Sequence, residues 1–173
     1  MRHRIFLIGF MGSGKSTLGK ILAEKLAFTF IDLDNVIEKL VGKTIPEIFS
    51  TSGELHFREI EQQALYQMIS EQSVVIATGG GAPCFFDNMT WMNAQGTTIY
   101  LNCSVETLAN RLKSEQGLRP LITGFDLEEL KVFIRRKLDE RSPVYHQCRL
   151  HVFDFNNVQE TADLIVRALA IGQ

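Results

Sequence analysis

The segment Gly9–Ser16 has the residue types that bind the phosphate chain of a nucleoside triphosphate. It reads Gly-Phe-Met-Gly-Ser-Gly-Lys-Ser and fits the P-loop pattern G-x-x-x-x-G-K-[S/T]. The glycines allow backbone N–H groups to turn inward around a phosphate, and the helix that starts here adds its positive dipole end. Lys15 brings a cation to the β and γ oxygens, and the Ser16 hydroxyl can bind Mg²⁺. We expect the nucleotide to contact Gly12, Ser13, Gly14, Lys15, Ser16 and Thr17.

Two carboxylates follow a short β-forming segment, Thr29–Asp32, where a crevice beyond the strand ends is expected. Asp32 and Asp34 flank Leu33, so the two carboxylates point to one side and the leucine to the other. Acids at this place can serve the hydration shell of Mg²⁺ and a hydroxyl group of a substrate. Asp34 can equally be the N-cap of the following helix, and the residues alone leave both roles open.

A guanidinium group and a carboxylate share one face of a helix that we expect at about Gly53–Gln72. Arg58 and Glu61 are spaced i, i+3, so the carboxylate can orient the planar, always charged fork of the arginine. Such a fork suits a carboxylate or a phosphate on a substrate. An ordinary surface ion pair, which contributes little to stability, would have the same pattern.

The triplet Gly79, Gly80 and Gly81 follows Thr78 and a strand expected at Ser73–Ala77. Consecutive glycines cost backbone entropy and add nothing to packing, so their presence needs a cause. Close approach of the main chain to a ligand is one cause, and it makes the triplet a candidate for substrate binding. A plain flexible loop is the other interpretation.

A polar stretch that contains glycine and proline, residues 113–125, separates two helical segments. A loop of this kind can open for ligand exchange and close to exclude water, which competes for the γ-phosphate. Arg119 lies inside it and can bring positive charge to the transition state of phosphoryl transfer. We therefore predict a mobile lid, with Arg119 as a catalytic and ATP-binding residue.

The elements that must position these residues alternate between strands and helices. Apolar runs of β-forming residues predict strands, besides the weaker Thr29–Asp32, at Arg4–Ile8, Ser73–Ala77, Thr97–Leu101 and Leu150–Phe155. Helical periodicity predicts a helix over Lys15–Leu26, and capping boxes begin further helices at Thr44, Asp126 and Asn157. Strands that are apolar throughout and alternate with helices form parallel sheets covered on both faces. We predict a three-layer α/β/α fold with a five-stranded parallel sheet and its ligands at the carboxyl ends of the strands.

The chain has 173 residues, 45% hydrophobic and 22% charged, which suits one domain over residues 1–173 and excludes a disordered chain. Lys plus Arg (18) and Asp plus Glu (20) give a net charge of −2, which excludes a broad basic face for nucleic acid. The three cysteines form no CxxC pair, which argues against a disulfide framework or a zinc site and favours a reducing compartment. The four histidines have no metal-ligand spacing. The apolar run Ile5–Met11 is too short to span a membrane. We expect a cytoplasmic monomer without nucleic-acid or membrane partners.

These motifs, in this order, resemble the shikimate kinase family over nearly the whole chain. The resemblance is carried by Gly9–Thr17, Asp32-x-Asp34, Phe57-Arg58-x-x-Glu61, Gly79–Gly81, Arg119-Pro120-Leu121, and Arg141 followed by Tyr145. It implies a P-loop kinase fold and transfer of the γ-phosphoryl group of MgATP to the 3-hydroxyl of shikimate. The ordered set is specific, whereas no single piece beyond the P-loop is.

The resemblance also implies roles for the acceptor-side residues. Asp34 would hold the acceptor hydroxyl and accept its proton, and Arg58 and Arg141 would clamp the substrate carboxylate. The N–H of Gly80 would meet another hydroxyl, and Arg119 would close over the ATP phosphates.

On the nucleotide side, the resemblance places Arg111 beside the adenine, although a solvated helix end explains this residue equally well. The strand Ser73–Ala77 is followed by Thr78 and not by the aspartate of a Walker B metal site, an absence that the family shares. Asp32 would then act on Mg²⁺ through a bound water. The adenine-wall position, Asn156–Val158, lacks the cationic side chain that family members can carry there.

Two other functions fit parts of the pattern. A gluconate-kinase-like or nucleoside-monophosphate-kinase-like enzyme would also use two arginines to bind an anionic acceptor. A nucleotide-binding switch, or a homologue without activity, would bind ATP without acceptor-stimulated ADP release. The complete set Asp34, Arg58, Gly80 and Arg141 argues against the second, since such a protein needs no acceptor pocket.

Overall fold

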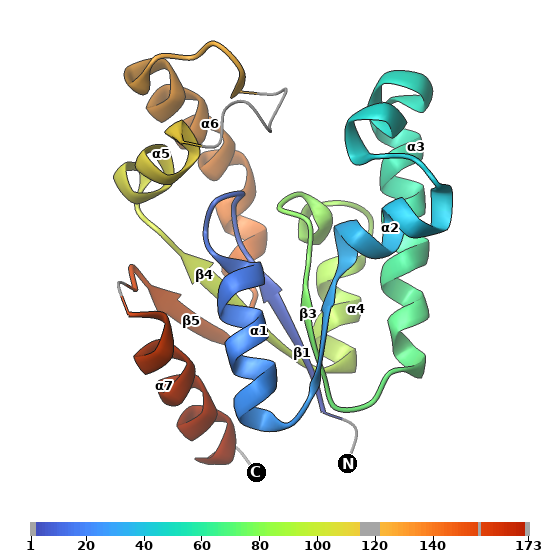
Figure 1. Ribbon diagram of the computed structural model, residues 1–173, viewed down its shortest axis with the longest axis vertical. Coiled ribbons are helices and arrows are strands. Elements are labelled where there is room, and N and C mark those ends of the chain that lie inside the picture. The colour runs from blue at the N-terminus through green and yellow to red at the C-terminus, as the bar shows by residue number, and fades with distance from the viewer. Residues whose placement is uncertain (1–2, 115–121, 156, 172–173) are drawn as a thin grey trace.

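The computed structural model describes residues 3–114, 122–155 and 157–171, which fold into three layers, α/β/α (Figure 1). Within these residues the central layer is a five-stranded parallel sheet with the order β2-β3-β1-β4-β5. Its strands are β1 (Arg4–Ile8), β2 (Thr29–Asp32), β3 (Val74–Ala77), β4 (Thr97–Asn102) and β5 (Leu150–Phe153). The predicted sheet is therefore confirmed. The last strand ends at Phe153 and not at Phe155 as expected, because Asp154 takes a positive φ of 20°.

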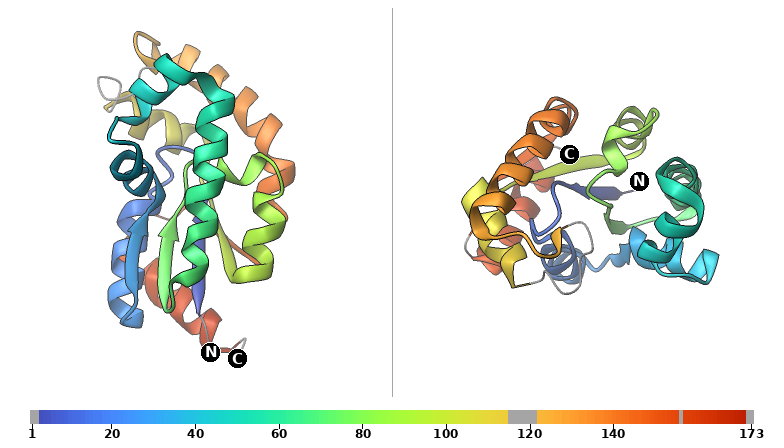
Figure 2. Two further views of the ribbon diagram at one scale, coloured as in Figure 1. Left: turned by 90° about the vertical axis from the view of Figure 1, so that its right-hand side faces the viewer. Right: turned by 90° about the horizontal axis from the view of Figure 1, so that it is seen from above.

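The sheet separates two apolar cores because successive strand residues point to opposite faces. In β1, Ile5 and Leu7 pack into one core, and Phe6 and Ile8 into the other. The helices α1 (Lys15–Leu26) and α7 (Val158–Ile171) cover the first face, and α3 (Ile45–Gln67) and α4 (Asn88–Gln95) cover the second (Figure 2). All five residues of β1 are buried, as expected for a central strand covered on both sides.

The remaining helices flank the carboxyl ends of the strands or join the layers. They are α2 (Leu33–Val41), α5 (Val105–Lys113), α6 (Leu127–Tyr145) and the short 3₁₀ turns η1 (Met68–Ser70) and η2 (Ala82–Cys84). Capping boxes at Thr44 and Asp126 begin α3 and α6 as predicted. The side chain of Asn157 accepts hydrogen bonds from the N–H groups of Gln159 and Glu160 at the start of α7.

The long helix expected at about Gly53–Gln72 has different limits. It begins at Ile45, bends at Gly53, where φ is 79° and ψ is 170°, and ends at Gln67. Residues 68–70 form a 3₁₀ turn instead of a continued α-helix. Because Gly53 leaves the helical conformation, the segment that starts at Thr44 and the segment that carries Arg58 meet at an angle.

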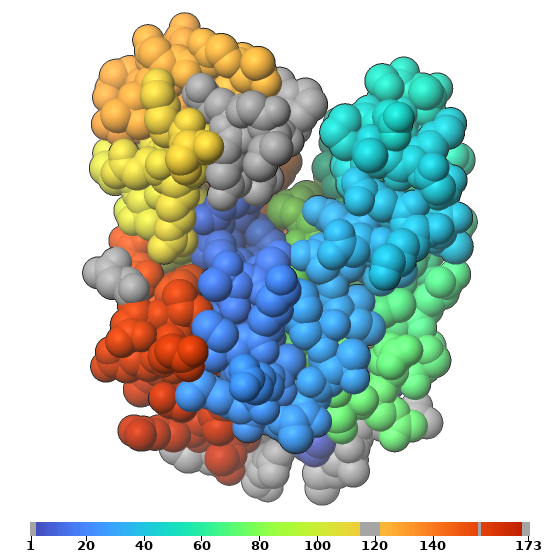
Figure 3. All heavy atoms as spheres, viewed as in Figure 1, coloured from blue at the N-terminus to red at the C-terminus, as the bar shows by residue number. Residues whose placement is uncertain are grey.

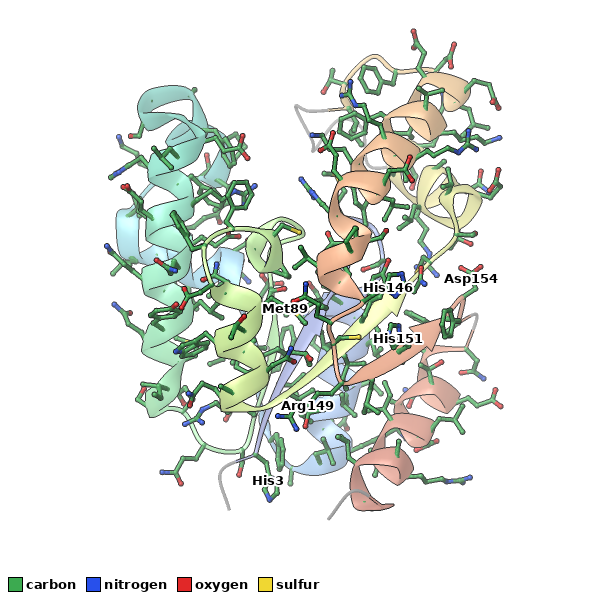
Figure 4. All side chains as sticks on the ribbon, turned by 180° about the vertical axis from the view of Figure 1, so that it is seen from behind. His3, Met89, His146, Arg149, His151 and Asp154 are labelled. Carbon is green, nitrogen blue, oxygen red and sulfur yellow. The ribbon has the colours of Figure 1, made fainter. Side chains whose placement is uncertain are left out.

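Stacked rings connect the end of α6 to the edge strand β5. His146, which ends α6, stacks on His151 of β5 with ring centres 5.3 Å apart (Figure 4). His151 stacks in turn on Phe153 at 5.8 Å.

Among the helices of the described residues, none is long and apolar enough to cross a membrane.

Candidate active site

A pocket of about 630 Å³ opens at the carboxyl ends of β1, β2 and β3. At this end the surface is hollowed between α3 and α6 (Figure 3). Most of the predicted site residues line it: Gly12, Gly14, Lys15, Ser16, Thr17, Asp32, Asp34, Arg58, Gly79, Gly80, Gly81, Arg111 and Arg141. Ser13 is fully buried within the P-loop, and Arg119 lies outside the described residues, as does most of the predicted lid.

The P-loop between β1 and α1 has the shape of an anion cradle. The glycines Gly9, Gly12 and Gly14 all take positive φ values, 142°, 77° and 91°, which other residues rarely adopt. No side chain caps the N-terminus of α1, so its first N–H groups can bind a phosphate. The Lys15 ammonium lies over the same loop and donates to the carbonyls of Gly9 at 2.8 Å and Phe10 at 2.9 Å.

Ser16 and Asp32 meet at the point where a metal ion would sit beside the P-loop. The Ser16 hydroxyl donates to Oδ2 of Asp32 at 2.7 Å. A hydroxyl and a carboxylate are hard oxygen donors that fit Mg²⁺, which takes few protein ligands and completes its shell with waters and phosphates. Within the described residues, no group of three or more His, Cys, Asp or Glu could hold a metal ion. A site of this kind thus suits Mg²⁺ brought in with a nucleotide.

Asp32, and not Asp34, is the N-cap of α2. Its Oδ1 accepts the backbone N–H of Asp34 at 3.2 Å, so the interpretation of Asp34 as the cap is wrong. Asp34 lies in the first turn of α2 and lines the pocket, close to the Gly-rich loop that follows β3. A methyl group on Gly79 would lie 3.2 Å from Oδ1 of Asp34. Its carboxylate thus lies in the pocket, next to the loop of Gly79–Gly81.

Arg58 and Glu61 on α3 form a buried ion pair, which excludes the interpretation as an ordinary surface pair. Arg58 is 6% exposed and Glu61 is 0% exposed. Nη1 of Arg58 donates to Oε2 of Glu61 at 2.7 Å, and Nη2 donates to Oε1 of Glu54 at 3.1 Å. Burial raises the pKa of Glu61 to about 7, although the charge of Arg58 acts to lower it. Within the described part of the chain, Nε of Arg58 and Oε1 of Glu61 have no hydrogen-bond partner.

The Gly-rich loop approaches these charged groups so closely that side chains would not fit. A methyl group on Gly79 would lie 2.4 Å from Oε1 of Glu61, and one on Gly81 would lie 2.5 Å from Nη2 of Arg58. We expected the glycines to admit a ligand to the main chain. The structure shows a second reason for glycine at these positions, because the absence of a side chain there leaves room for side chains of α2 and α3.

Arg141 of α6 brings a second guanidinium group to the same pocket. Its Cζ lies 5.6 Å from the centre of the Phe10 ring, within the range of a cation–π contact. One turn further along α6, the hydroxyl of Tyr145 donates to the carbonyl of Gly80 and ties this helix to the Gly-rich loop. The carboxyl of Glu61 lies close enough for Arg58 and then Arg141 to lower its pKa against the effect of burial.

Arg111 is not a solvated helix end. Its guanidinium donates to the carbonyls of Gly12 at 3.3 Å and Phe155 at 3.5 Å, and it lies 5.5 Å from the centre of the Phe155 ring. Phe155 is 7% exposed and lines the pocket next to the P-loop. Sequence reasoning treated Phe155 only as the end of a strand, since an apolar residue there gives no signal of ligand contact.

Two aromatic pocket residues were also missed because apolar side chains give no signal of ligand contact. Phe49 and Phe57 line the pocket beside Arg58 and form the apolar wall of its acceptor side. The position of Phe57 next to Arg58 in the sequence was the only signal available for either ring. Met11, Ile45, Ser114 and Val158 line the pocket as well.

A phosphate cradle beside a pocket with two guanidinium groups and a carboxylate defines a P-loop kinase for a small anionic acceptor. The family model described as shikimate kinase matches residues 11–170. The chain therefore belongs to the shikimate kinase family, and it is a kinase that uses ATP as its co-substrate.

Relatives in this family are similar over most of their length. The shikimate kinase of Parabacteroides distasonis is 47% identical over 93% of this chain and 92% of its own. The shikimate kinase structure from Bacteroides thetaiotaomicron superposes with a TM-score of 0.93 at 40% identity, over 98% of this chain and 99% of that one. The shikimate kinase of Acinetobacter baumannii in complex with shikimate gives a TM-score of 0.89 at 33% identity, over 100% and 96% of the two chains.

Proposed function

We propose that the protein transfers the γ-phosphoryl group of ATP to the 3-hydroxyl of shikimate, which gives shikimate 3-phosphate and ADP. The observation that carries this proposal is one pocket of about 630 Å³ that holds both the P-loop and the two guanidinium groups of Arg58 and Arg141. An acceptor with a carboxylate and ring hydroxyls matches these groups. Support comes from the relative of Acinetobacter baumannii, whose structure holds shikimate.

The acceptor side orients the substrate for in-line transfer. Arg58 and Arg141 bind the ring carboxylate, and the apolar wall of Phe49 and Phe57 contacts the ring. The N–H of Gly80 meets a second hydroxyl. Orientation of this kind removes much of the entropic barrier of a reaction between two substrates.

Asp34 receives the proton during transfer. The oxygen of the 3-hydroxyl forms a bond to the γ-phosphorus, its proton passes to the carboxylate of Asp34, and the bond to the β-phosphate oxygen breaks as ADP leaves. The position of Asp34 at the pocket floor, in the first turn of α2, supports this role.

The nucleotide side neutralises the charge of the transferring group. Lys15, the N–H groups of the P-loop and the N-terminus of α1 face the phosphates, and Arg111 lies beside the adenine. The Ser16 hydroxyl, and Asp32 through a water, would hold Mg²⁺, which would supply further positive charge to the phosphate chain. The expected role of Arg119 at the phosphates concerns a residue that lies outside the described part of the chain.

The proposal extends to the organisation of the protein. We propose a single domain that acts as a monomer in the cytoplasm, without nucleic-acid or membrane partners. The size and the near balance of charges support this. Sedimentation of the purified chain with and without substrates tests the monomer.

The test of the proposed reaction is ADP production as a function of shikimate concentration, with and without Mg²⁺. We expect saturable, Mg²⁺-dependent ADP release with shikimate and little with gluconate or nucleoside monophosphates. A preference for another acceptor would contradict the substrate assignment. ATP binding without acceptor-stimulated ADP release would indicate a nucleotide-binding switch.

A further inference from the structure

We propose that Phe85 is a positioning residue for the acceptor, because its ring holds the guanidinium of Arg58 in the orientation that meets the substrate carboxylate. Phe85 directly follows η2 and continues the loop of Gly79–Gly81. This inference rests on the proposed function, in which Arg58 binds the carboxylate of shikimate.

The contact between Phe85 and Arg58 is the shortest of three ring contacts around this guanidinium. Cζ of Arg58 lies 4.2 Å from the centre of the Phe85 ring, against 5.0 Å for Phe57 and 5.8 Å for Phe49. A cation within about 6 Å of a ring centre is attracted by the π face, most strongly where water is excluded. Since Arg58 is only 6% exposed, little water can compete with the ring for the guanidinium.

Phe85 acts on the substrate only through Arg58. Phe49 and Phe57 line the pocket, whereas the lining that the structure describes does not include Phe85. The contact that the structure gives the ring of Phe85 is with the guanidinium, at 4.2 Å from Cζ to the ring centre. The substrate meets the arginine and the apolar wall, and the arginine meets Phe85.

Hydrogen bonds alone leave the guanidinium incompletely held. Nη1 is bound to buried Glu61, but Nη2 is bound to Glu54, whose side chain is 57% exposed, and exposed ion pairs contribute little. Nε has no hydrogen-bond partner among the residues that the structure describes. A flat ring over the guanidinium restricts its tilt, while the N–H groups at its edge can still donate to a carboxylate in the same plane.

The loop that carries Phe85 contacts Arg58 at a second place. The main chain at Gly81 lies so close that a methyl group there would come within 2.5 Å of Nη2. Both the ring and this glycine follow β3, on the rigid sheet, while Arg58 belongs to α3. The loop thus sets the position of the guanidinium relative to the Gly-rich main chain, which faces the same substrate.

The test compares Phe85→Leu with wild-type protein, using the full chain. Loss of the π face should raise KM and Kd for shikimate about three- to thirty-fold, while kcat and the KM for ATP stay unchanged. Phe85→Tyr should restore the wild-type KM, because it keeps the ring. Phe86→Leu is the matched control, since Phe86 is the next residue and is 53% exposed.

Thermal melting of each variant shows whether it folds, and Phe85→Met takes the place of the leucine variant where that one does not. An unchanged KM for shikimate in the ring-less variants overturns the inference. Equal losses for shikimate and ATP also overturn it, because they indicate general damage to the fold. Failure of the wild-type protein to bind shikimate in calorimetry refutes the proposed function itself, and with it this role of Phe85.

Discussion

Arg58 and Glu61 form an ion pair that is almost completely removed from water. Burying two charges costs several kcal/mol of desolvation, and their attraction offsets this only with good geometry. The bond of 2.7 Å between Nη1 and Oε2 supplies that geometry, yet one atom on each side chain has no hydrogen-bond partner in the described ranges 3–114, 122–155 and 157–171. A pair of this kind adds little to stability. Its effect is to hold the guanidinium of Arg58 in a fixed position.

Glu61 should make stability depend on pH. Burial raises its pKa from 4.5 to about 7, so between these values the folded chain holds this proton more tightly than the unfolded chain. The resulting stabilisation is complete below pH 4.5 and is lost as the pH rises to 7. Glu61→Gln cannot titrate, so it should gain stability relative to wild type over this interval, by at most about 3 kcal/mol.

Urea denaturation of both proteins at pH 5 and pH 7.5 measures this difference in the free energy of unfolding. Glu59→Gln, at an exposed position of the same helix, controls for the loss of a carboxylate from α3 without a change in a buried group. A stability difference between Glu61→Gln and wild type that is the same at both pH values would show that Glu61 does not titrate in this range.

Asp34 should matter for turnover and not for ATP binding. Asp34→Asn keeps the shape of the side chain but removes the proton acceptor, and it leaves the P-loop untouched. We expect kcat to fall about 100-fold or more, with the Kd for ATP unchanged. A coupled ADP assay and ATP titration measure both, with Asp163→Asn at an exposed ion pair as control. Normal turnover by Asp34→Asn would refute the role of this carboxylate.

At the scale of elements, the Gly-rich loop after β3 determines how closely α2 and α3 approach the sheet. It admits the side chains of Glu61 and Arg58 to within a distance at which a Cβ atom would collide, and that of Asp34 to a tight contact of 3.2 Å. Tyr145 ties α6, the helix that carries Arg141, to the same loop through a hydrogen bond to the carbonyl of Gly80. The acceptor side is thus built around one loop on which three helices converge.

Gly79→Ala should therefore damage acceptor binding. The new methyl group would lie 2.4 Å from Oε1 of Glu61, and the buried carboxyl must move and shift Arg58 with it. We expect kcat/KM for shikimate to fall more than ten-fold, since a misplaced clamp loses both binding and orientation. The assay is steady-state kinetics with shikimate varied at saturating ATP.

Gly42→Ala is the control for this substitution. Gly42 ends α2 with a φ of 70°, and a methyl group there meets no atom within 4 Å. Alanine in that conformation should lower the free energy of unfolding by about 1–2 kcal/mol without affecting kinetics. Equal kinetic losses in both variants would mean that general destabilisation, and not the contact with Glu61, explains the result.

At the scale of the whole molecule, two apolar cores pack on the sheet, and the pocket that we propose for both ligands opens at one of its ends. The strands supply little to the ligands directly, because the loops at their carboxyl ends carry the binding groups. Binding at this end stabilises the folded chain by mass action, since the unfolded chain has no cradle.

MgATP should therefore raise the stability of the wild-type protein. At 100 times its Kd, a ligand adds about 2.7 kcal/mol to the free energy of unfolding. Lys15→Met should lose most of this gain, because the cation that faces the β and γ oxygens is gone. Thermal melting with and without MgATP measures the effect, and Lys137→Met, at an ion pair on α6, should respond like wild type. An undiminished shift in Lys15→Met would contradict the role of this lysine.

Local patterns in the chain were enough to determine the architecture. β1 and α1 have the limits that their apolar run and helical period predict, and the capping boxes at Thr44 and Asp126 form as expected. The P-loop was equally predictable, because its shape depends on glycines a few residues apart. These features follow from interactions between near neighbours in the sequence, which composition and spacing record directly.

The tertiary structure alone decided which charges are buried and which ring meets which charge. Spacing placed Arg58 and Glu61 on one helix face, but only the packing of that face against the loop after β3 removed them from water. The contacts of Phe155 with Arg111 and of Phe85 with Arg58 could not be predicted from the sequence either. Burial and contact depend on segments far apart in the chain, and a single sequence carries no local mark of the partner that folding brings to each residue.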